Sequence, residues 1–331
     1  MDTEPALLLN RTEVEQLLSV PECIDAVERV FRLQGEDKIP PSGILGVKAR
    51  DGGLHVKAGF LPGEKNYLVA KLNANFPMNP ARLGLPAIQG MIVICDGENG
   101  SPLALLDSID ITLKRTAAAS AVAAKFLARK DAAAATICGC GAQGRAQLRA
   151  IQSVCALQRV FAFDADLRAS KTFAIELSRE LKIDIRSVGA LPEALRNSDV
   201  VVTCTPATKF FVHRKDVAAG TFVAAVGADD AHKQEIDPAL MASSKIVADS
   251  VEQCCAIGDT HHAIAHGLTR KENVYAELGE IVAGRKPGRT GEDEIIIFDS
   301  TGIAVEDAAA SVLVYEKARE RGLGDRFEFA G

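Results

Sequence analysis

The stretch from Ala133 to Leu148 constrains the fold of this chain most strongly, because it carries three glycines at the spacing G-x-G-x-x-G. An apolar run precedes Gly139, and a helical pattern follows Gly144. In a strand–turn–helix unit of this kind the first glycine permits a tight turn. The second lets a pyrophosphate approach the backbone, and the third lets the helix pack on the strand. The stretch therefore predicts a dinucleotide site at a helix N-terminus.

A carboxylate follows this turn at the spacing expected for ribose recognition. The predicted strand Arg159–Phe163 ends on Asp164, twenty positions after Gly144. A carboxylate there holds the ribose hydroxyls, and its charge would repel a 2′-phosphate, so we expect NAD as the cofactor. Arg168 could weaken this discrimination. The alternative is a buried glycine turn in an α/β sheet that binds no ligand.

Length and composition limit the classes of protein that remain. A chain of 331 residues favours two domains. A net charge of −6 and the lack of a basic run argue against a nucleic-acid partner. No apolar stretch reaches the roughly 18 residues of a membrane span. The start of the chain lacks a signal-peptide pattern, so we expect a cytoplasmic protein. None of the eight cysteines forms a C-x-x-C pair, and we expect reduced thiols.

The first part of the chain mixes helices with antiparallel strands. A short strand at Ala6–Leu9 precedes a helical region in which Thr12 is the expected N-cap and Glu15 its capping-box partner. Antiparallel strands are predicted at 54–58, 67–72 and 90–94. A helix rich in small residues is predicted from Asp110 to Leu127.

From about residue 131 to about residue 300 strands and helices alternate, which predicts a doubly wound parallel sheet. After the strand at 159–163 a helix is expected at 168–181. Further strands are expected at 183–187, 200–203, 221–226, 245–248 and 294–298. The turn Asp299–Gly302 would lie at the carboxyl edge of the sheet, where ligands bind in such folds. A last helix at 305–321 is expected to return to the first domain.

Three charged residues could carry chemistry, each with a plain alternative. Lys71 ends an apolar strand, where it needs a partner or extends its amine to solvent. Arg115 could grip a carboxylate or phosphate with two hydrogen bonds, or lie on the surface. Asp229 follows a sheet strand and could act as a general acid/base, or belong to a helix cap or solvated turn. His55 and Lys57 share one face of a neighbouring strand and point either into the same cleft or into water.

Two groups of residues could suggest a metal, but we predict none. His261, His262 and His266 include a pair at i, i+4, yet no pattern supplies a third ligand. Cys138 and Cys140 lie inside the glycine turn itself.

Taken together, these motifs resemble the ornithine cyclodeaminase/mu-crystallin family over roughly residues 40 to 320. The segments that carry the resemblance are Lys71…Asn75-Phe-Pro…Gly84-Leu-Pro86, Ser101-Pro-Leu-Ala-Leu-Leu-Asp107…Ile111-Thr112…Arg115-Thr-Ala-Ala-Ala-Ser120, Gly139-Cys-Gly-Ala-Gln143, Val226-Gly-Ala-Asp229…Lys233-Gln-Glu235 and Phe298-Asp-Ser-Thr-Gly302. The resemblance implies an α/β protein with a Rossmann domain at 116–304. It also implies a second α+β domain for substrate binding and dimerisation, built from both chain ends (1–115 and 305–331).

The resemblance also implies roles for individual residues. Lys71 and Arg115 would bind substrate, with Lys71 also catalytic, and Asp229 would be the acid/base. The cofactor would be lined by Arg115, Thr116, Gly139, Gly141, Ala142, Gln143, Gly144, Asp164, Thr205, Val226, Lys233 and Ser300. A homodimer is implied by the family alone.

One departure from the family pattern bears on the substrate. Members that cyclise ornithine carry an arginine where this chain has Ser42, after Pro40 and Pro41. Our hypothesis is that Lys57 replaces the lost cation and binds substrate. We therefore expect an NAD-dependent enzyme that reduces a small α-imino acid, or a cyclic one, to the amino acid. The alternatives are cyclodeamination of ornithine or another diamino acid with catalytic NAD, and a non-catalytic nicotinamide-dependent binding protein.

Overall fold

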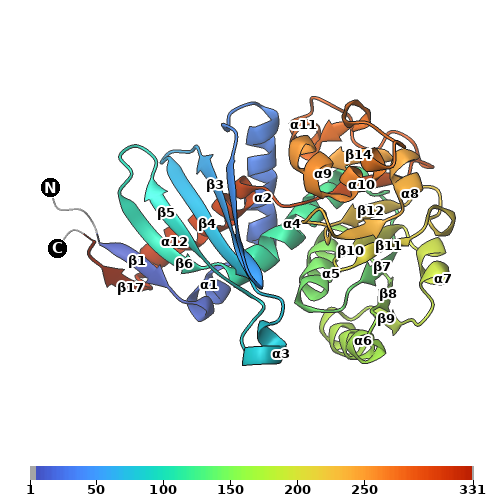
Figure 1. Cartoon of the computed structure of the whole chain (residues 1–331), viewed down its shortest axis with the longest axis horizontal. Coiled ribbons are helices and arrows are strands. Elements are labelled where there is room, and N and C mark those ends of the chain that lie inside the picture. The colour runs from blue at the N-terminus through green and yellow to red at the C-terminus, as the bar shows by residue number, and fades with distance from the viewer. Residues whose placement is uncertain (1–4, 330–331) are drawn as a thin grey trace. The chain divides into compact units, whose positions relative to one another are not determined.

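The computed structural model describes residues 5–329, which divide into two compact units (Figure 1). Unit 1 joins the chain up to Arg115 with the chain from Ile303 onward, so both ends of the sequence contribute to it. Unit 2 is the continuous stretch Thr116–Gly302.

Unit 1 is built on a seven-stranded sheet with the order β17-β1-β6-β5-β4-β3-β2. Only β1 and β6 pair in parallel, and every other neighbouring pair is antiparallel. The strands are β1 Ala6–Leu9, β2 Gly43–Ala49, β3 Gly52–Leu61, β4 Tyr67–Asn75, β5 Ile88–Asp96, β6 Pro102–Asp107 and β17 Asp325–Phe327. The three antiparallel strands expected from the sequence are β3, β4 and β5, each longer than predicted.

The first helix of unit 1 begins at a capping box that differs from the predicted one. The helices of this unit are α1 Arg11–Leu17, α2 Val20–Gly35, α3 Asn79–Leu83 and α12 Ala304–Arg321, and α4 Ile109–Leu127 starts in it. The expected cap at Thr12 with Glu15 is wrong. The Asn10 side chain accepts a hydrogen bond from the Glu13 N–H at 3.1 Å, and Glu13 accepts one from the Asn10 N–H at 2.9 Å. The capping box thus lies two residues earlier than predicted.

Alternation along the strands gives the sheet of unit 1 two different faces. Tyr67, Val69 and Lys71 of β4 are buried on the face that α12 covers. A β-carbon added at Gly59 of β3 would meet Ala304 of α12 at 3.3 Å, which places α12 against the same face. The first turn of α12 therefore lies over the strands that carry Lys57 and Lys71.

Unit 2 is a doubly wound α/β unit, as predicted. Its eight parallel strands have the order β15-β14-β16-β12-β10-β7-β8-β9. They are β7 Ala134–Cys138, β8 Arg159–Phe163, β9 Asp184–Ser187, β10 Val200–Thr203, β12 Phe222–Ala225, β14 Lys245–Ala248, β15 Ala276–Glu277 and β16 Ile296–Asp299. The chain runs outward from β7 to β9 and then returns to β10 on the other side of β7. Ligands of such sheets bind outside the carboxyl ends of the strands where the order reverses, which here are β7 and β10.

Helices and a small second sheet complete unit 2. The helices are α5 Ala142–Val154, α6 Leu167–Leu181, α7 Leu191–Arg196, α8 Pro238–Ala242, α9 Val251–Ile257, α10 Asp259–Ala265, α11 Leu278–Val282 and the 3₁₀ turns η1 Arg214–Asp216 and η2 Lys271–Asn273. A parallel pair, β11 Thr208–Val212 and β13 Gln234–Ile236, forms the small sheet. Between residues 5 and 329 we find no helix with the length and apolar character needed to cross a bilayer.

Candidate functional site

The glycine turn between β7 and α5 has the backbone that its spacing predicts. Gly139 has φ +101°, a conformation that favours glycine, and a β-carbon there would lie 2.9 Å from the Cys204 carbonyl oxygen. A β-carbon at Gly144 would lie 1.9 Å from the Gly139 carbonyl oxygen, so only glycine lets the helix approach the turn. At Gly141 nothing lies within 4 Å of an added β-carbon. The middle position is therefore open for a ligand to approach the backbone.

Asp164 is held at the end of β8 by backbone N–H groups. Its carboxylate accepts hydrogen bonds from the Cys140 N–H at 2.8 Å and from the Asp166 N–H at 2.9 Å. Asp166 in turn caps α6 by accepting from the Arg168 N–H at 2.9 Å. The acidic side chain and the glycine turn are thus joined directly, in the arrangement that suits a ribose beside a pyrophosphate.

The turns that follow the neighbouring strands lie along the same edge of the sheet. Thr205 follows β10, and its side-chain Cγ2 would lie 3.1 Å from a β-carbon at Gly139. Val226 follows β12 and is buried. Ser300 follows β16, and its hydroxyl donates to Asp249 at 3.0 Å. These three predicted cofactor residues all follow the carboxyl ends of sheet strands.

Asp229 lies in a turn with its side chain 55% exposed. Lys233 donates to its carboxylate at 2.5 Å, and the Lys233 carbonyl is bonded to His262 Nε2 at 2.8 Å. An exposed carboxylate can exchange protons with water, which an acid/base group must do between turnovers. Of the two alternatives for Asp229, a helix cap is wrong, because no helix begins at this turn.

The predicted substrate cations of unit 1 meet at two carboxylates of α12. Lys71 donates to Asp307 at 2.8 Å, and Arg115 donates to the same carboxylate at 2.8 Å through Nε. Arg115 also donates to Glu306 at 2.6 Å through Nη1. All four side chains are buried, so neither Lys71 nor Arg115 is the solvent-exposed residue of the plain alternative.

Burial and pairing compete in setting the protonation of this cluster. Burial lowers the pKa of Lys71 to about 8, with the charges of Arg115 and Lys57 acting in the same direction and Asp307 opposing them. Burial disfavours a charged Arg115, but Asp307 and Glu306 outweigh it and raise the pKa of Arg115. Burial also opposes ionisation of Asp307, yet Arg115 and Lys71 hold its pKa below the usual range.

Lys57 belongs to the same group of charges. Its Cα is paired with that of Lys71 across β3 and β4, so both side chains are on one face of the sheet. Its charge acts on both Lys71 and Asp307. The group contains three cations, Lys57, Lys71 and Arg115, and two carboxylates, Glu306 and Asp307. Its formal charge is therefore +1, which favours an anionic ligand. His55 shares this face by alternation but is exposed.

The sequence analysis missed the acidic partners of these cations. Glu306 and Asp307 follow the turn that ends at Gly302, and they lie in the first turn of the last helix. Two adjacent carboxylates in the apolar pattern Ala304-Val-Glu-Asp-Ala-Ala were a usable signal, because buried charges require partners. Glu235 is buried as well, but its position in the sequence carries no distinct pattern that would reveal this.

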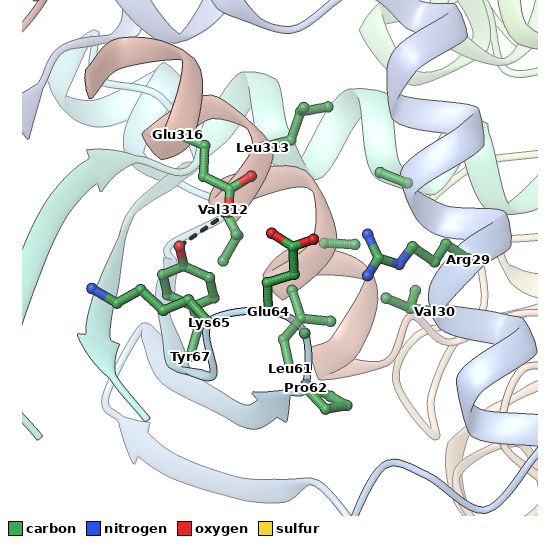
Figure 2. Close-up of a pocket in the computed structure, with 13 residues that line it drawn as sticks. Arg29, Val30, Leu61, Pro62, Glu64, Lys65, Tyr67, Val312, Leu313 and Glu316 are labelled. Carbon is green, nitrogen blue, oxygen red and sulfur yellow. Dashed lines mark hydrogen bonds between the residues drawn. The ribbon is translucent and has the colours of Figure 1, made fainter. Parts of the chain in front are cut away.

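A cavity of about 380 Å³ in unit 1 lies between α2, α12 and the loop from β3 to β4 (Figure 2). Tyr67 donates to Glu316 at 3.0 Å on its wall, and Figure 2 shows Arg29 and Glu64 pointing into the same space. Its lining includes none of the sequence-predicted site residues. Opposite charges on its walls offer no net cation, so we do not assign the substrate carboxylate to it.

Two of the histidines considered for metal binding have other partners, and burial disfavours the metal-binding form of the cysteines. His262 bonds to the Lys233 carbonyl and His261 Nδ1 to the Cys255 carbonyl at 3.3 Å. Burial raises the pKa of Cys140 to about 12 and that of Cys138 well above its usual value, which disfavours the thiolates that bind metals. Across residues 5–329 no group of three or more His, Cys, Asp or Glu side chains is arranged to hold a metal ion.

Proteins of known activity resemble this chain along its whole length. Alanine dehydrogenase of Archaeoglobus fulgidus is 38% identical over 98% of both chains. An archaeal alanine dehydrogenase dimer with bound NAD superposes with a TM-score of 0.92 at 37% identity, covering 98% of this chain and 99% of the other. Iminosuccinate reductase of Paracoccus denitrificans is 32% identical over 97% of this chain and 99% of its own. Its structure with NAD⁺ gives a TM-score of 0.91.

A third relative was solved with both cofactor and amino acid. Thermococcus litoralis Δ1-pyrroline-2-carboxylate reductase, in complex with NADH and L-proline, gives a TM-score of 0.91 at 36% identity, covering 97% of this chain and 99% of the other. The three relatives thus act on imino or amino acids, and all three structures contain NAD or NADH. The model of the ornithine cyclodeaminase/mu-crystallin family matches residues 4–322, and the chain belongs to that family.

Proposed function

We propose that this protein is an NAD-dependent oxidoreductase that reduces a small α-imino acid to the corresponding amino acid. The observation that carries the proposal is the buried cluster of Lys71, Arg115 and Asp307, which provides cations for a carboxylate. The chain that holds this cluster is similar over nearly its whole length to an alanine dehydrogenase and to an iminosuccinate reductase. The open glycine turn and Asp164 of unit 2 fit the dinucleotide.

Each residue has a separate task in this proposal. Arg115 and Lys71 bind the substrate carboxylate, and Lys71 polarises the imine. The hydrogen bonds of Arg115 to the two α12 carboxylates use Nε and Nη1, so in this proposal Nη2 is the atom that donates to the substrate carboxylate. Lys57 adds a third cation where cyclising relatives have an arginine near Ser42.

The chemistry needs one hydride and one proton. When bound, the reduced nicotinamide supplies the hydride to the C=N carbon. Asp229 donates the proton to the nitrogen as the amine forms, and accepts it when the reaction runs in reverse. Lys233, hydrogen-bonded to Asp229, fixes the direction of that carboxylate.

We propose in addition that the protein is a homodimer. The face of the unit 1 sheet opposite α12 is apolar, and Leu45, Val47, Leu68 and Met91 on it are each about half exposed. A hollow of about 360 Å³ on this face is lined by apolar residues of β3, β4 and β5 together with Pro40 and Pro41. A continuous apolar face of this kind marks an interface. The eight cysteines are free thiols, which suits a reducing compartment, and we propose the cytoplasm.

The test is the loss of NADH absorbance with purified protein, NADH, ammonia and a panel of α-keto acids (pyruvate, glyoxylate, oxaloacetate) together with a cyclic imino acid. Oxidation of NADH with any of them supports the proposal and names the substrate class. No oxidation, with ammonia released from ornithine at catalytic NAD, would replace the proposal with cyclodeamination. Binding of NAD without turnover on any substrate would leave the binding-protein alternative.

A further inference from the structure

Among the buried carboxylates of unit 2, three are linked to one another through backbone N–H groups: Glu235 of β13, Asp259 of α10 and Asp299 of β16. They form a chain of contacts. Asp299 accepts from the Thr260 N–H at 2.8 Å and from the Asp259 N–H at 3.3 Å. Asp259 accepts from the Glu235 N–H at 2.9 Å. The chain therefore ends at Glu235, whose own carboxylate reaches the edge of the sheet where the cofactor turns lie.

The Glu235 carboxylate joins two of those turns. Oε1 accepts from both the N–H and the hydroxyl of Thr205, each at 2.7 Å. Oε2 accepts from the Gly227 N–H at 2.9 Å. Thr205 follows β10 and Gly227 follows β12, and these strands are neighbours in the sheet. One side chain thus fixes the separation of two turns that follow neighbouring strands.

The fit around Glu235 leaves little freedom. A β-carbon at Gly227 would lie 2.5 Å from the Glu235 carboxylate and 2.5 Å from the Thr205 carbonyl oxygen. The Asp229 N–H donates to the Gly227 carbonyl at 3.1 Å, so the turn that carries Asp229 starts at the bonded residue. Thr205 also lies against the glycine turn between β7 and α5, because its Cγ2 would be 3.1 Å from a β-carbon at Gly139.

We propose that Glu235 is a positioning residue for the nicotinamide cofactor, because its carboxylate sets the turns that carry Thr205 and Asp229. The proposal rests on the proposed function for the identity of the cofactor. Glu235 touches neither cofactor nor substrate in this role and acts through the two backbone N–H groups and the Thr205 hydroxyl. A purely structural carboxylate would stabilise unit 2 without a selective effect on these turns.

Glu235→Gln is the informative variant because the amide is isosteric but cannot accept from all three donors. Its NH₂ group must face either the Gly227 N–H or the Thr205 N–H, and one turn is released. We expect the dissociation constant of NAD⁺, measured by calorimetry without substrate, to rise about ten- to hundredfold. Amide hydrogen exchange at Thr205 and Gly227 of the cofactor-free protein should also accelerate, while exchange in the central strand β12 stays unchanged.

Asp216→Asn is the matched control. Asp216 is a buried carboxylate of the same unit, and its ion pair with Arg196 at 2.8 Å involves neither turn. It should leave NAD⁺ affinity and the exchange of both amides as in the wild type. Equal exchange rates in Glu235→Gln and wild type, or an equal loss of NAD⁺ affinity in Asp216→Asn, would overturn the proposal.

A second pair of variants keeps the test decisive if Glu235→Gln folds poorly. Thr205→Val removes the hydroxyl donor and Thr205→Ser keeps it, so exchange at the Gly227 amide, which is bonded to the other oxygen of Glu235, should accelerate in the first and not in the second. No difference between them would count against the proposal. If the wild type bound no NAD⁺, the proposed function would fail, while the exchange measurements would still decide whether Glu235 holds the two turns.

Discussion

Asp307→Asn tests whether a buried carboxylate keeps the proposed substrate lysine charged. Asp307 contacts both Lys71 and Arg115 at 2.8 Å and is 1% exposed. Asparagine keeps the size and one acceptor oxygen but removes the negative charge. Burial already lowers the pKa of Lys71 to about 8, and Asp307 opposes that effect. The variant should therefore lower the pKa of Lys71 further.

The magnitude follows from the contact distance. An opposite charge this close raises a lysine pKa by roughly 1 to 3 pH units, so losing it should move the pKa of Lys71 from about 8 to about 6. The charged fraction of Lys71 at neutral pH then falls from about nine-tenths to about one-tenth. If only the charged form binds the substrate carboxylate, KM at neutral pH should rise about tenfold.

The assay is KM for the imino acid across the pH range from weakly acid to weakly alkaline. The variant KM must rise with pH relative to the wild-type KM, because lysine is charged below its pKa and loses its charge above it. The ratio of the variant KM to the wild-type KM should be about 2 near pH 6 and about 50 near pH 8. A ratio that stays constant over this range would refute the reasoning.

Glu306→Gln is the matched control on the same helical turn. Glu306 is also fully buried, and it forms an ion pair with Arg115 at 2.6 Å. Breaking one partner of a buried ion pair costs about 3 to 5 kcal/mol, so both variants should unfold at lower temperature. Only Asp307→Asn should show a KM ratio that grows with pH.

Four further variants probe other parts of the molecule. Asp229→Asn should lower turnover by about two to four decades with little change in NAD⁺ binding, and wild-type turnover would refute its acid/base role. Gly141→Ala should fold normally, because its added carbon meets no protein atom within 4 Å. It should bind NAD⁺ more weakly, because the same carbon would occupy the space through which the pyrophosphate approaches the backbone. Gly144→Ala should instead destabilise unit 2, since its carbon would lie 1.9 Å from the Gly139 carbonyl oxygen, and thermal unfolding distinguishes the two. Leu68→Lys should yield monomers in light scattering if the apolar sheet face forms the dimer, and an unchanged mass would contradict that assignment.

The parts of the fold with a strong local period could be predicted from the sequence. The strands at 159–163, 200–203 and 245–248 agree with β8, β10 and β14 to the residue, because each is a short apolar run between polar turns. Strand β2 is not predicted as a separate element, because its seven residues, Gly43–Ala49, contain two glycines, which are unfavourable in strands. In the structure all seven residues are exposed. The place of β2 in the sheet depends on pairing with β3, which is a tertiary effect.

The candidate site was predictable only in part for a similar reason. The glycine turn carries its conformational requirement in its own residues, so its geometry followed from the spacing. Lys71 and Asp307 are 236 positions apart, and a pairing over that distance leaves no local pattern. Glu235 likewise reaches Thr205 across 30 positions. Long-range contacts between single charged residues are therefore what sequence reasoning missed.

The acidic residues of α12 explain how the buried cations stay charged for the substrate-binding role that we propose for them. Without Asp307 and Glu306, burial would drive Lys71 toward its neutral form and leave Arg115 as an uncompensated buried charge. With these two carboxylates present, both cations stay charged, but the negative charges of Asp307 and Glu306 weaken the attraction of the cluster for a substrate carboxylate. Lys57 restores a net positive charge to the group, because it acts on Lys71 and Asp307 from the paired strand. If the cluster binds substrate as we propose, it would favour a single carboxylate, and any second carboxylate on the substrate would need a cation from outside it.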